Sequence, residues 1–470
     1  MPSRISESQF SESENILDMC SLLSKNGFLP AMKPLKRLPD AYYEQWEQIL
    51  DNLPTLLKEK TIRTEIGNLK VLSTSRLNTE REWQRAYMIL CFLTHGYIWG
   101  GDIPSEVRTS IRHEEQGPES RDLTFAQVLP PAITVPLLQA SDHLDLPPIA
   151  TYAALNLWNF SSRGEDFTHL DGLRTLHTFS GTEDESWFFA LSIVIEARGA
   201  RIIPIMLQAI DAIKNDDYET ISRALSDMAT CISQLTPLLD RMSEKCDPMV
   251  FYHHFRPFLA GTKNMAAAGL PNGVFYDEGN GIGELRQLRG GSNGQSSLIQ
   301  FFDLVLGIDH HSADRQRTRK GISAPAKAAD GELSFFEELR LYMPGPHREF
   351  LSRVSRMDKI KDFVHSAPSS PAQQRLRQAY QDATKALGDF RQGHMNMVTR
   401  YVIVPSRKPA PSSSSGVNLA TASLQVNKGV AKELTGTGGT ALIPFLRTAR
   451  DDTYGAGLAV ASQDASVIKA

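Results

Sequence analysis

The feature that most constrains the fold is a periodic stripe of side chains near the C-terminal end of the chain. Between residues 373 and 404 the stripe advances in steps of three or four residues, through Leu376, Tyr380, Ala383, Leu387, Phe390, His394, Met397 and Tyr401. This spacing forms one face of an amphipathic α-helix of about nine turns, and Pro405 lies just beyond its expected end. Such a face packs against other helices, so we expect His394 to point into the protein interior.

The same helical period recurs along most of the chain, whereas strand signals are scarce. Apolar residues at three- and four-residue steps occupy residues 49–57, 83–98, 188–196, 202–213, 221–239 and 298–306. The sequence therefore predicts an all-α fold.

Length and breaks in composition indicate two domains. A chain of 470 residues is too long for one compact core. An aromatic-rich stretch after Pro147-Pro148 ends in a polar segment at 161–167, which is typical of a boundary. We expect a smaller N-terminal helical domain over residues 1–170 and a larger one over 171–470.

The composition of the C-terminal region predicts a loop and then a helix. Residues 408–416 are rich in Ser and Pro, and residues 435–440 are a cluster of Thr and Gly. These compositions favour a mobile loop over 406–440. A short helix is expected over 441–447, with an uninformative tail after it.

Charge and composition argue against several classes of protein. The net charge is −4 and the basic residues form no stripe, so we expect no nucleic-acid partner. No apolar run reaches the roughly 20 residues that span a bilayer, so we expect no membrane segment. The four cysteines form no Cys-x-x-Cys pair, and the first residues lack the order of a signal peptide. We therefore expect free thiols and a cytoplasmic protein.

The residues alone leave two interpretations of His394. A buried imidazole is expected to be neutral and must satisfy its ring nitrogens. It is either a core histidine that bonds a backbone carbonyl or a ligand of a metal or haem iron. Asp303 lies in an apolar run and needs a partner if it is buried, and Arg391 lies close to the face of His394. Either these two residues pair beside His394, or each is exposed at the edge of its helix.

Five segments, in order along the chain, carry a family resemblance. They are Phe251–Lys263, Gly290–Ser297 with the helix that contains Asp303, Tyr342–Arg348, Gly393–Pro405 and Gly436–Thr440. Together they resemble the indoleamine 2,3-dioxygenases, over roughly residues 140–450.

The resemblance implies an enzyme whose larger domain binds haem b. It would convert L-tryptophan and O2 to N-formyl-L-kynurenine, the first step of the kynurenine pathway, with ferrous haem reduced by an electron donor. We also expect a monomer. By position, His394 matches the family's iron ligand, and Asp303 and Arg391 match the acid and the arginine on the same side of the haem. Gly291 and Ser292 are expected against the haem edge.

The resemblance also implies where the substrate lies. Arg256 matches the arginine that binds the substrate carboxylate, and its planar guanidinium suits two parallel hydrogen bonds. Ser192 matches a small polar residue over the iron, and Ser192 and Arg256 are the expected catalytic residues. No residue matches a distal histidine, so no general base is expected. The other residues expected to contact the substrate are Tyr152, Leu155, Phe188, Phe189, Phe251, Leu259, Ser292, Asn293 and Thr437.

Some residues depart from the family pattern. Asn293 occupies a position that is often a small residue, and Leu155 replaces a smaller residue of some members. These departures keep two alternatives open: a haem-binding sensor or signalling paralogue of low turnover, and a helical scaffold without catalysis. The paired histidines at 253–254 and 310–311 show no ligand spacing, and we interpret them as surface or structural residues.

Overall fold

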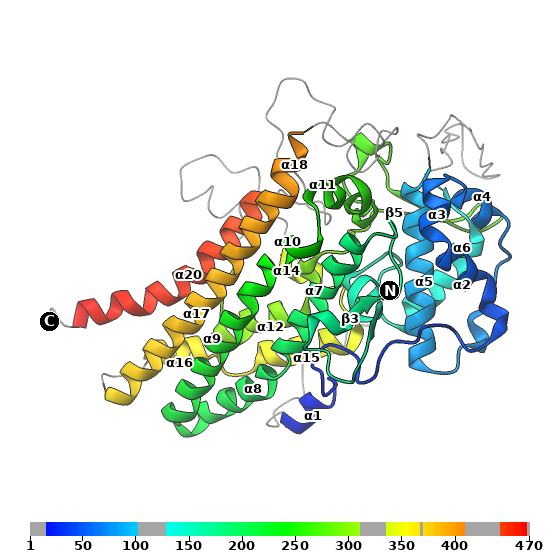
Figure 1. Ribbon diagram of the computed structural model, residues 1–470. Helices are drawn as coiled ribbons and strands as arrows, with labels where there is room; N and C mark the ends of the chain where they lie inside the picture. The colour runs from blue at the N-terminus through cyan, green and yellow to red at the C-terminus, as the bar shows by residue number, and fades with distance from the viewer. Residues whose placement is uncertain (1–15, 102–127, 311–334, 367–369, 409–441, 468–470) are drawn as a thin grey trace, which may run out of the picture.

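The computed structural model describes residues 16–101, 128–310, 335–366, 370–408 and 442–467, and this part of the chain is mostly helical (Figure 1). The first helices are α1 (Ile16–Cys20), α2 (Glu44–Asp51), α3 (Leu53–Lys58), α4 (Ile62–Gly67), α5 (Glu80–Trp99) and α6 (Pro131–His143). The middle of the chain adds α7 (Glu183–Gly199), α8 (Ile202–Ala212), α9 (Tyr218–Asp240), α10 (Met242–Lys245), α11 (Pro248–Val250) and α12 (Ser297–Leu306). The last are α14 (Phe335–Arg340), α15 (Gly345–Arg356), α16 (Ile360–Ser366), α17 (Pro371–Val398), α18 (Val404–Ser406) and α20 (Leu442–Val467). The all-α prediction is confirmed.

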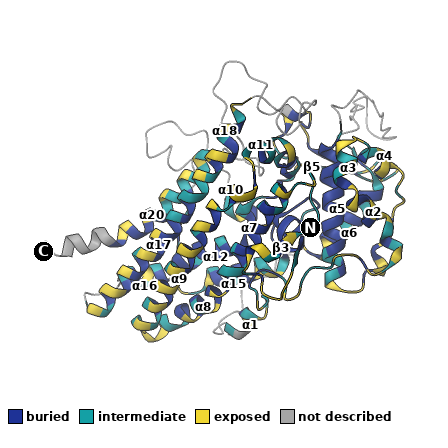
Figure 2. Ribbon diagram, in the orientation of Figure 1, coloured by how far each residue is buried: buried dark blue, intermediate teal, exposed yellow. Residues whose placement is uncertain are grey.

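Helix α5 forms the centre of the N-terminal part of the fold. Its residues are buried without interruption from Arg85 to Trp99. A helix that is buried on every face lies inside a core rather than at a surface. Accordingly α2, α4 and α6 pack around it. Figure 2 shows the buried residues of this region in dark blue, next to those around α7.

Helix α17 contains the stripe of the sequence and packs between α9 and α20 (Figure 1). It begins with a capping box, in which the Gln373 N–H donates to the Ser370 hydroxyl (3.3 Å) and the Ser370 N–H donates to the Gln373 side chain (3.0 Å). Most stripe residues are buried as expected, namely Leu376, Tyr380, Ala383, Leu387, Phe390 and Tyr401.

The C-terminal end of this helix differs from the prediction. Regular α-helix ends at Val398, and the chain continues through the π-helical turn η11 (Thr399–Ile403) into α18. Pro405 therefore lies inside the last helical turn and not beyond it. Proline lacks an N–H and clashes with the carbonyl four residues earlier, and a wider π turn before it lets the coil continue. Two more π-helical turns occur in the described residues, η4 (Ala153–Leu157) and η7 (Phe251–Phe255).

The structure contains two small sheets that the sequence analysis missed. Strand β1 (Val128–Leu129) pairs in parallel with β4 (Val274–Gly279), which forms an antiparallel hairpin with β5 (Ile282–Arg286). Strands β2 (Phe160–Ser162) and β3 (Leu173–Thr175) form a second antiparallel pair. The hairpin was detectable, because Asn280 and Gly281 both take positive φ at its turn, and Asn-Gly between short strands is a strong hairpin signal.

Two expected helices have different limits in the structure. The expected helix over 49–57 is two helices, α2 and α3, which separate at Asn52 because Pro54 starts a new first turn. The short helix expected over 441–447 is the beginning of α20, which continues to Val467. None of the described helices has both the length and the apolar character needed to cross a membrane. The division into domains near residue 170 stays a prediction.

A buried ion pair joins α2 to α5 and gives a test of this part of the fold. Arg85 donates to both carboxylate oxygens of Glu47, and both side chains are 1% exposed. We expect Arg85→Met to lower the free energy of unfolding by roughly 3–5 kcal/mol, since it leaves a buried carboxylate unpaired. The control is Arg37→Met, which removes two exposed ion pairs, with Glu44 and Asp51, and is expected to cost about 1 kcal/mol. Urea denaturation measures the free energy of unfolding of both variants. If Arg85→Met and Arg37→Met lower it equally, the prediction is contradicted.

Candidate active site

Segments from both halves of the chain meet around one large cavity. It contains about 1740 Å3 of space free of protein atoms, including its mouth, and most of its wall is apolar. The wall residues come from η4, α7, α9, α10, the segment of η7 and η8 (Arg256–Leu259), the loop before α12, and from α12, α14, α17, η11 and α20. Each of the three π-helical turns contributes wall residues, among them Leu155, Phe251 and Tyr401.

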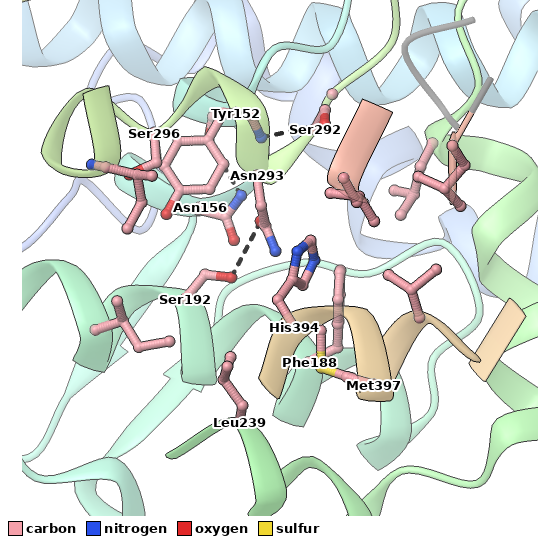
Figure 3. A pocket seen from close by; sticks show the side chains of 18 of the residues that line it. Tyr152, Asn156, Phe188, Ser192, Leu239, Ser292, Asn293, Ser296, His394 and Met397 are labelled. Carbon is pink, nitrogen blue, oxygen red and sulfur yellow. Dashed lines mark hydrogen bonds between the residues drawn. The ribbon is translucent and has the colours of Figure 1, made fainter. Parts of the chain in front are cut away.

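His394 projects from α17 into this cavity (Figure 3). Within the described residues neither of its ring nitrogens has a hydrogen-bond partner. A core histidine that bonds a backbone carbonyl, the first interpretation of the sequence, is therefore wrong. Burial, with a smaller contribution from Arg391, lowers the pKa of His394 to about 4. The imidazole is neutral at physiological pH, and its lone pair is available to a ligand in the cavity.

The pairing of Asp303 with Arg391 is confirmed. One guanidinium nitrogen of Arg391 lies 2.7 Å from each carboxylate oxygen of Asp303, and the same side chain donates to the hydroxyl of Thr453 on α20. Burial opposes ionisation of Asp303, but Arg391 and His310 outweigh it and lower the pKa of this carboxyl. Arg391 lines the cavity one turn from His394, whereas Asp303 lies behind it. The pair thus connects α12, α17 and α20 beside the imidazole.

His310 is a residue of this cluster that the sequence analysis did not place. Its Nε2 lies 3.0 Å from Asp303, and its ring stacks on Phe336 at 4.1 Å. The interpretation of His310 as a structural residue agrees with these contacts. A local pattern could not reveal the stacking contact, because Phe336 belongs to a separate helix, α14.

Polar side chains gather at one end of the cavity (Figure 3). The hydroxyl of Ser192 donates to Asn293 Oδ1 at 3.4 Å, and Asn156 lies beside them. Behind this group, the hydroxyls of Tyr152 and Ser296 donate to one oxygen of Glu196, at 3.1 and 2.6 Å. Burial raises the pKa of Glu196 to about 7. We call Asn156, Ser192 and Asn293 the amide end of the cavity.

The loop over residues 290–294 lines the cavity with its backbone. A Cβ atom at Gly291 would lie 2.4 Å from a methyl group of Leu155, so a larger residue there would require the Leu155 side chain to shift. The Ser292 hydroxyl accepts the N–H of Gly294 at 3.2 Å and turns the loop toward α12. Gly291, Ser292, Asn293 and Leu155 all line the cavity, as the sequence analysis expected.

Aromatic side chains and Arg256 form another wall. The ring of Phe188 packs against Phe189 and Phe251, with both centroid distances 5.3 Å. Arg256 follows on η8 with its guanidinium 5.4 Å from the Tyr252 ring, and burial lowers its pKa below the usual 12.5. It stays a cation, since arginine is not deprotonated in proteins. Leu259 completes this segment.

Two side chains of α5 position the backbone of this arginine segment, and the sequence analysis missed both. The Nδ1 of His95 is 2.5 Å from the carbonyl of Phe258, and its Nε2 is 3.2 Å from the N–H of Ala150. The indole of Trp99 donates to the carbonyl of Ala260 at 2.9 Å. The imidazole of His95 therefore links the η8 segment to the loop that leads into Tyr152. His95 and Phe258 are 163 positions apart in the sequence, which explains why no local pattern revealed the contact.

Thr437 and the loop expected over 406–440 lie almost wholly outside the described residues, so their placement stays a prediction. The sequence analysis also missed wall residues from α14 and α20. They are Phe335, Phe336, Leu339, Leu442, Phe445, Leu446 and Ala449. The three- and four-residue steps from Leu442 to Phe445 and Leu446 were a usable signal for the α20 face.

These residues fit a haem. An apolar cavity suits a flat macrocycle, and a single neutral imidazole without a hydrogen bond suits the iron at its centre. Gly291, which lines the cavity, adds no side chain to the space inside it. Arg391, held by Asp303, places a fixed positive charge on the side of His394.

Comparison with known proteins agrees with this geometry. The family model described as indoleamine 2,3-dioxygenase matches residues 18–456. The chain belongs to the indoleamine 2,3-dioxygenase family. It is 38% identical over 439 residues to indoleamine 2,3-dioxygenase nanC of Aspergillus nanangensis, covering 92% of this chain and 94% of that protein. It is 36% identical over 456 residues to indoleamine 2,3-dioxygenase of Saccharomyces cerevisiae, covering 93% of each.

A third relative has a different name. The chain is 35% identical over 429 residues to 6-hydroxytryptophan 2,3-dioxygenase fscD of Fusarium equiseti, covering 91% of this chain and 94% of that protein. All three relatives are named dioxygenases, and this member of the family is an oxidoreductase. The resemblance of the five sequence segments is confirmed.

The contact made by His95 predicts a pH dependence of stability. Burial lowers the pKa of His95 to about 4, from 6.5. Between these values the unfolded chain binds a proton that the folded chain does not, so the free energy of unfolding falls as the pH decreases from 6.5 to 4. His95→Gln is expected to remove up to about 3 kcal/mol of this decrease. The free energy of unfolding is measured by urea denaturation between pH 4 and 6.5, with the exposed His254→Gln as the control variant. If this free energy changes with pH equally in wild type and both variants, the prediction is refuted.

Proposed function

We propose that this enzyme cleaves the C2–C3 bond of the indole ring of L-tryptophan with O2, giving N-formyl-L-kynurenine and opening the kynurenine pathway. Both oxygen atoms enter the product as carbonyl groups, so the reaction needs no leaving group. The observation that carries the proposal is the shared cavity, which unites the unpartnered imidazole of His394, the aromatic wall and Arg256. One relative is named for 6-hydroxytryptophan, so the substrate class is that of indole amino acids, with L-tryptophan as its parent.

His394 would hold the haem iron, and Arg391 and Asp303 would fix the helix that carries it. Gly291 and Ser292 would lie against the haem edge. When bound, haem supplies the iron centre that activates O2, and this requires its ferrous form and therefore an electron donor. We propose that the enzyme acts as a monomer.

The protein residues bind and orient the substrate. Arg256 offers the substrate carboxylate two parallel hydrogen bonds from a partly dehydrated guanidinium, where charge-assisted bonds are strong. Phe188, Phe189 and Phe251 offer edges and faces to the indole ring. Ser192 is small and would leave room for O2, while its hydroxyl donates to Asn293 at 3.4 Å. These contacts position the reactants and exclude water, and they require no general base.

A haem-binding sensor of low turnover would use the same cavity. Product formation separates the two functions. Under reducing conditions with L-tryptophan and O2, the proposed function requires absorbance of N-formylkynurenine to accumulate over many turnovers, and a sensor gives none.

The iron ligand is tested by His394→Ala. We expect the purified variant to show no Soret band after haem supplementation, because the cavity offers the iron no second imidazole on that wall. Wild type and exposed His254→Ala are expected to show the band. Circular dichroism reports whether the variant keeps its helices, and a full Soret band in a folded His394→Ala protein would overturn the assignment.

The carboxylate site is tested by Arg256→Lys. We expect the KM for L-tryptophan to rise about tenfold or more, because an ammonium group cannot form the paired hydrogen bonds of a guanidinium. The haem spectrum should stay that of wild type. Steady-state kinetics measure the KM, and substitution of the exposed Arg223 by Lys is the matched control. An unchanged KM in Arg256→Lys would show that the substrate carboxylate binds elsewhere.

A further inference from the structure

The amide end of the cavity has hydrogen-bonding capacity that the protein leaves unused. Asn156 comes from η4 and Asn293 from the loop before α12, and both line the cavity beside Ser192 (Figure 3). The Nδ2 of Asn156 donates to the carbonyl of Tyr152 at 3.3 Å, but its Oδ1 is buried without a partner. Asn293 accepts the Ser192 hydroxyl through Oδ1, while its Nδ2 donates to no other described residue.

Unused amide groups in a buried site affect which ligand fits. The side chain of Asn156 is buried, with only 3% of the residue exposed. A buried polar group without a partner costs free energy, and a ligand that satisfies it recovers that cost. The C–H edge of an unsubstituted benzo ring cannot supply a hydrogen bond. A hydroxyl can, since it accepts from the Asn293 amide and donates to a carbonyl oxygen such as Asn156 Oδ1.

The charges around the cavity indicate that the indole ring of the substrate lies at the amide end. The carboxylate of an indole amino acid needs a cation, and Arg256 supplies one from η8. Asn156, Ser192 and Asn293 carry no positive charge, so a carboxylate would find no counter-ion among the residues of the amide end. The ammonium and the carboxylate share one carbon atom, so the part of the ligand that can extend away from Arg256 is the indole ring.

We propose that Asn156 and Asn293 select indole amino acids that carry a hydroxyl group on the benzo ring. This inference rests on the proposed function, because it assumes that the same cavity binds the indole substrate. Asn293 donates to the hydroxyl oxygen, and Asn156 accepts the hydroxyl hydrogen. Both residues are specificity determinants and take no part in the oxygen chemistry.

The test compares L-tryptophan with its 4-, 5-, 6- and 7-hydroxy derivatives, using the haem-loaded enzyme. For at least one derivative we expect kcat/KM to exceed that of L-tryptophan about tenfold or more, the range of one well-placed hydrogen bond. The derivative with a methyl group at the same ring position matches the hydroxyl in size without its hydrogen bonds, and it should lack the advantage. Calorimetric titration without O2 should show the same order of affinities.

The variants decide whether the amides cause the preference. Asn293→Ala and Asn156→Leu should abolish the advantage of the hydroxylated substrate, and both should raise the relative rate on L-tryptophan. Asn396→Ala, an exposed residue of α17, is the matched control and should keep the wild-type ratio. Equal losses on all substrates would instead assign the amides to the amino-acid group and overturn the inference.

The two proposals fail in different ways. If no substrate is consumed although the Soret band is present, the dioxygenase function fails, and calorimetry still decides whether the hydroxyl is preferred in binding. If L-tryptophan is consumed at least as efficiently as every hydroxylated derivative, the function stands and the selectivity is refuted.

Discussion

Burial of one neutral imidazole is the constraint on which the site depends. His394 lies on a helix that packs on two sides, so its ring can avoid a polar partner only because the third side faces a cavity. Filling that space with side chains would leave a buried ring nitrogen without a hydrogen bond, which is costly. Three features of His394 therefore have the same origin in the fold. They are the open space beside the ring, its low pKa, and the lack of a bond from either ring nitrogen to a described residue.

The surrounding contacts keep this space open. Asp303 and Arg391 join α12 to α17 on one side, and their two short contacts leave the guanidinium little freedom. On the other side, His95 and Trp99 of the N-terminal helix α5 hold the carbonyls that flank Leu259. The cavity is thus bounded by elements whose spacing is set by buried polar contacts, while its lining stays mostly apolar.

The sequence predicted what depends on periodicity and on local motifs. The stripe on α17 and the existence of α7 and α9 were predictable, because each follows from spacing along one helix. The Asp303–Arg391 pair was one of two predicted alternatives, because a buried charge needs a partner. The ends of α7 were missed, since the helix is longer at both ends than the expected 188–196. The roles of His95 and His310 were not predictable, because a histidine allows many roles and the contacts with Phe258 and Phe336 join separate elements. The β4–β5 hairpin was missed although its Asn-Gly turn was visible.

The π-helical turns have a consequence for the shape of this cavity. Each of η4, η7 and η11 winds its chain more widely than an α-helix does, and each contributes wall residues. The hydrogen bonds of a π turn join residues five apart instead of four, so each of these turns is wider than a regular α-helix where it meets the cavity. Single π turns often occur at functional sites, and here three of the described ones border the same chamber.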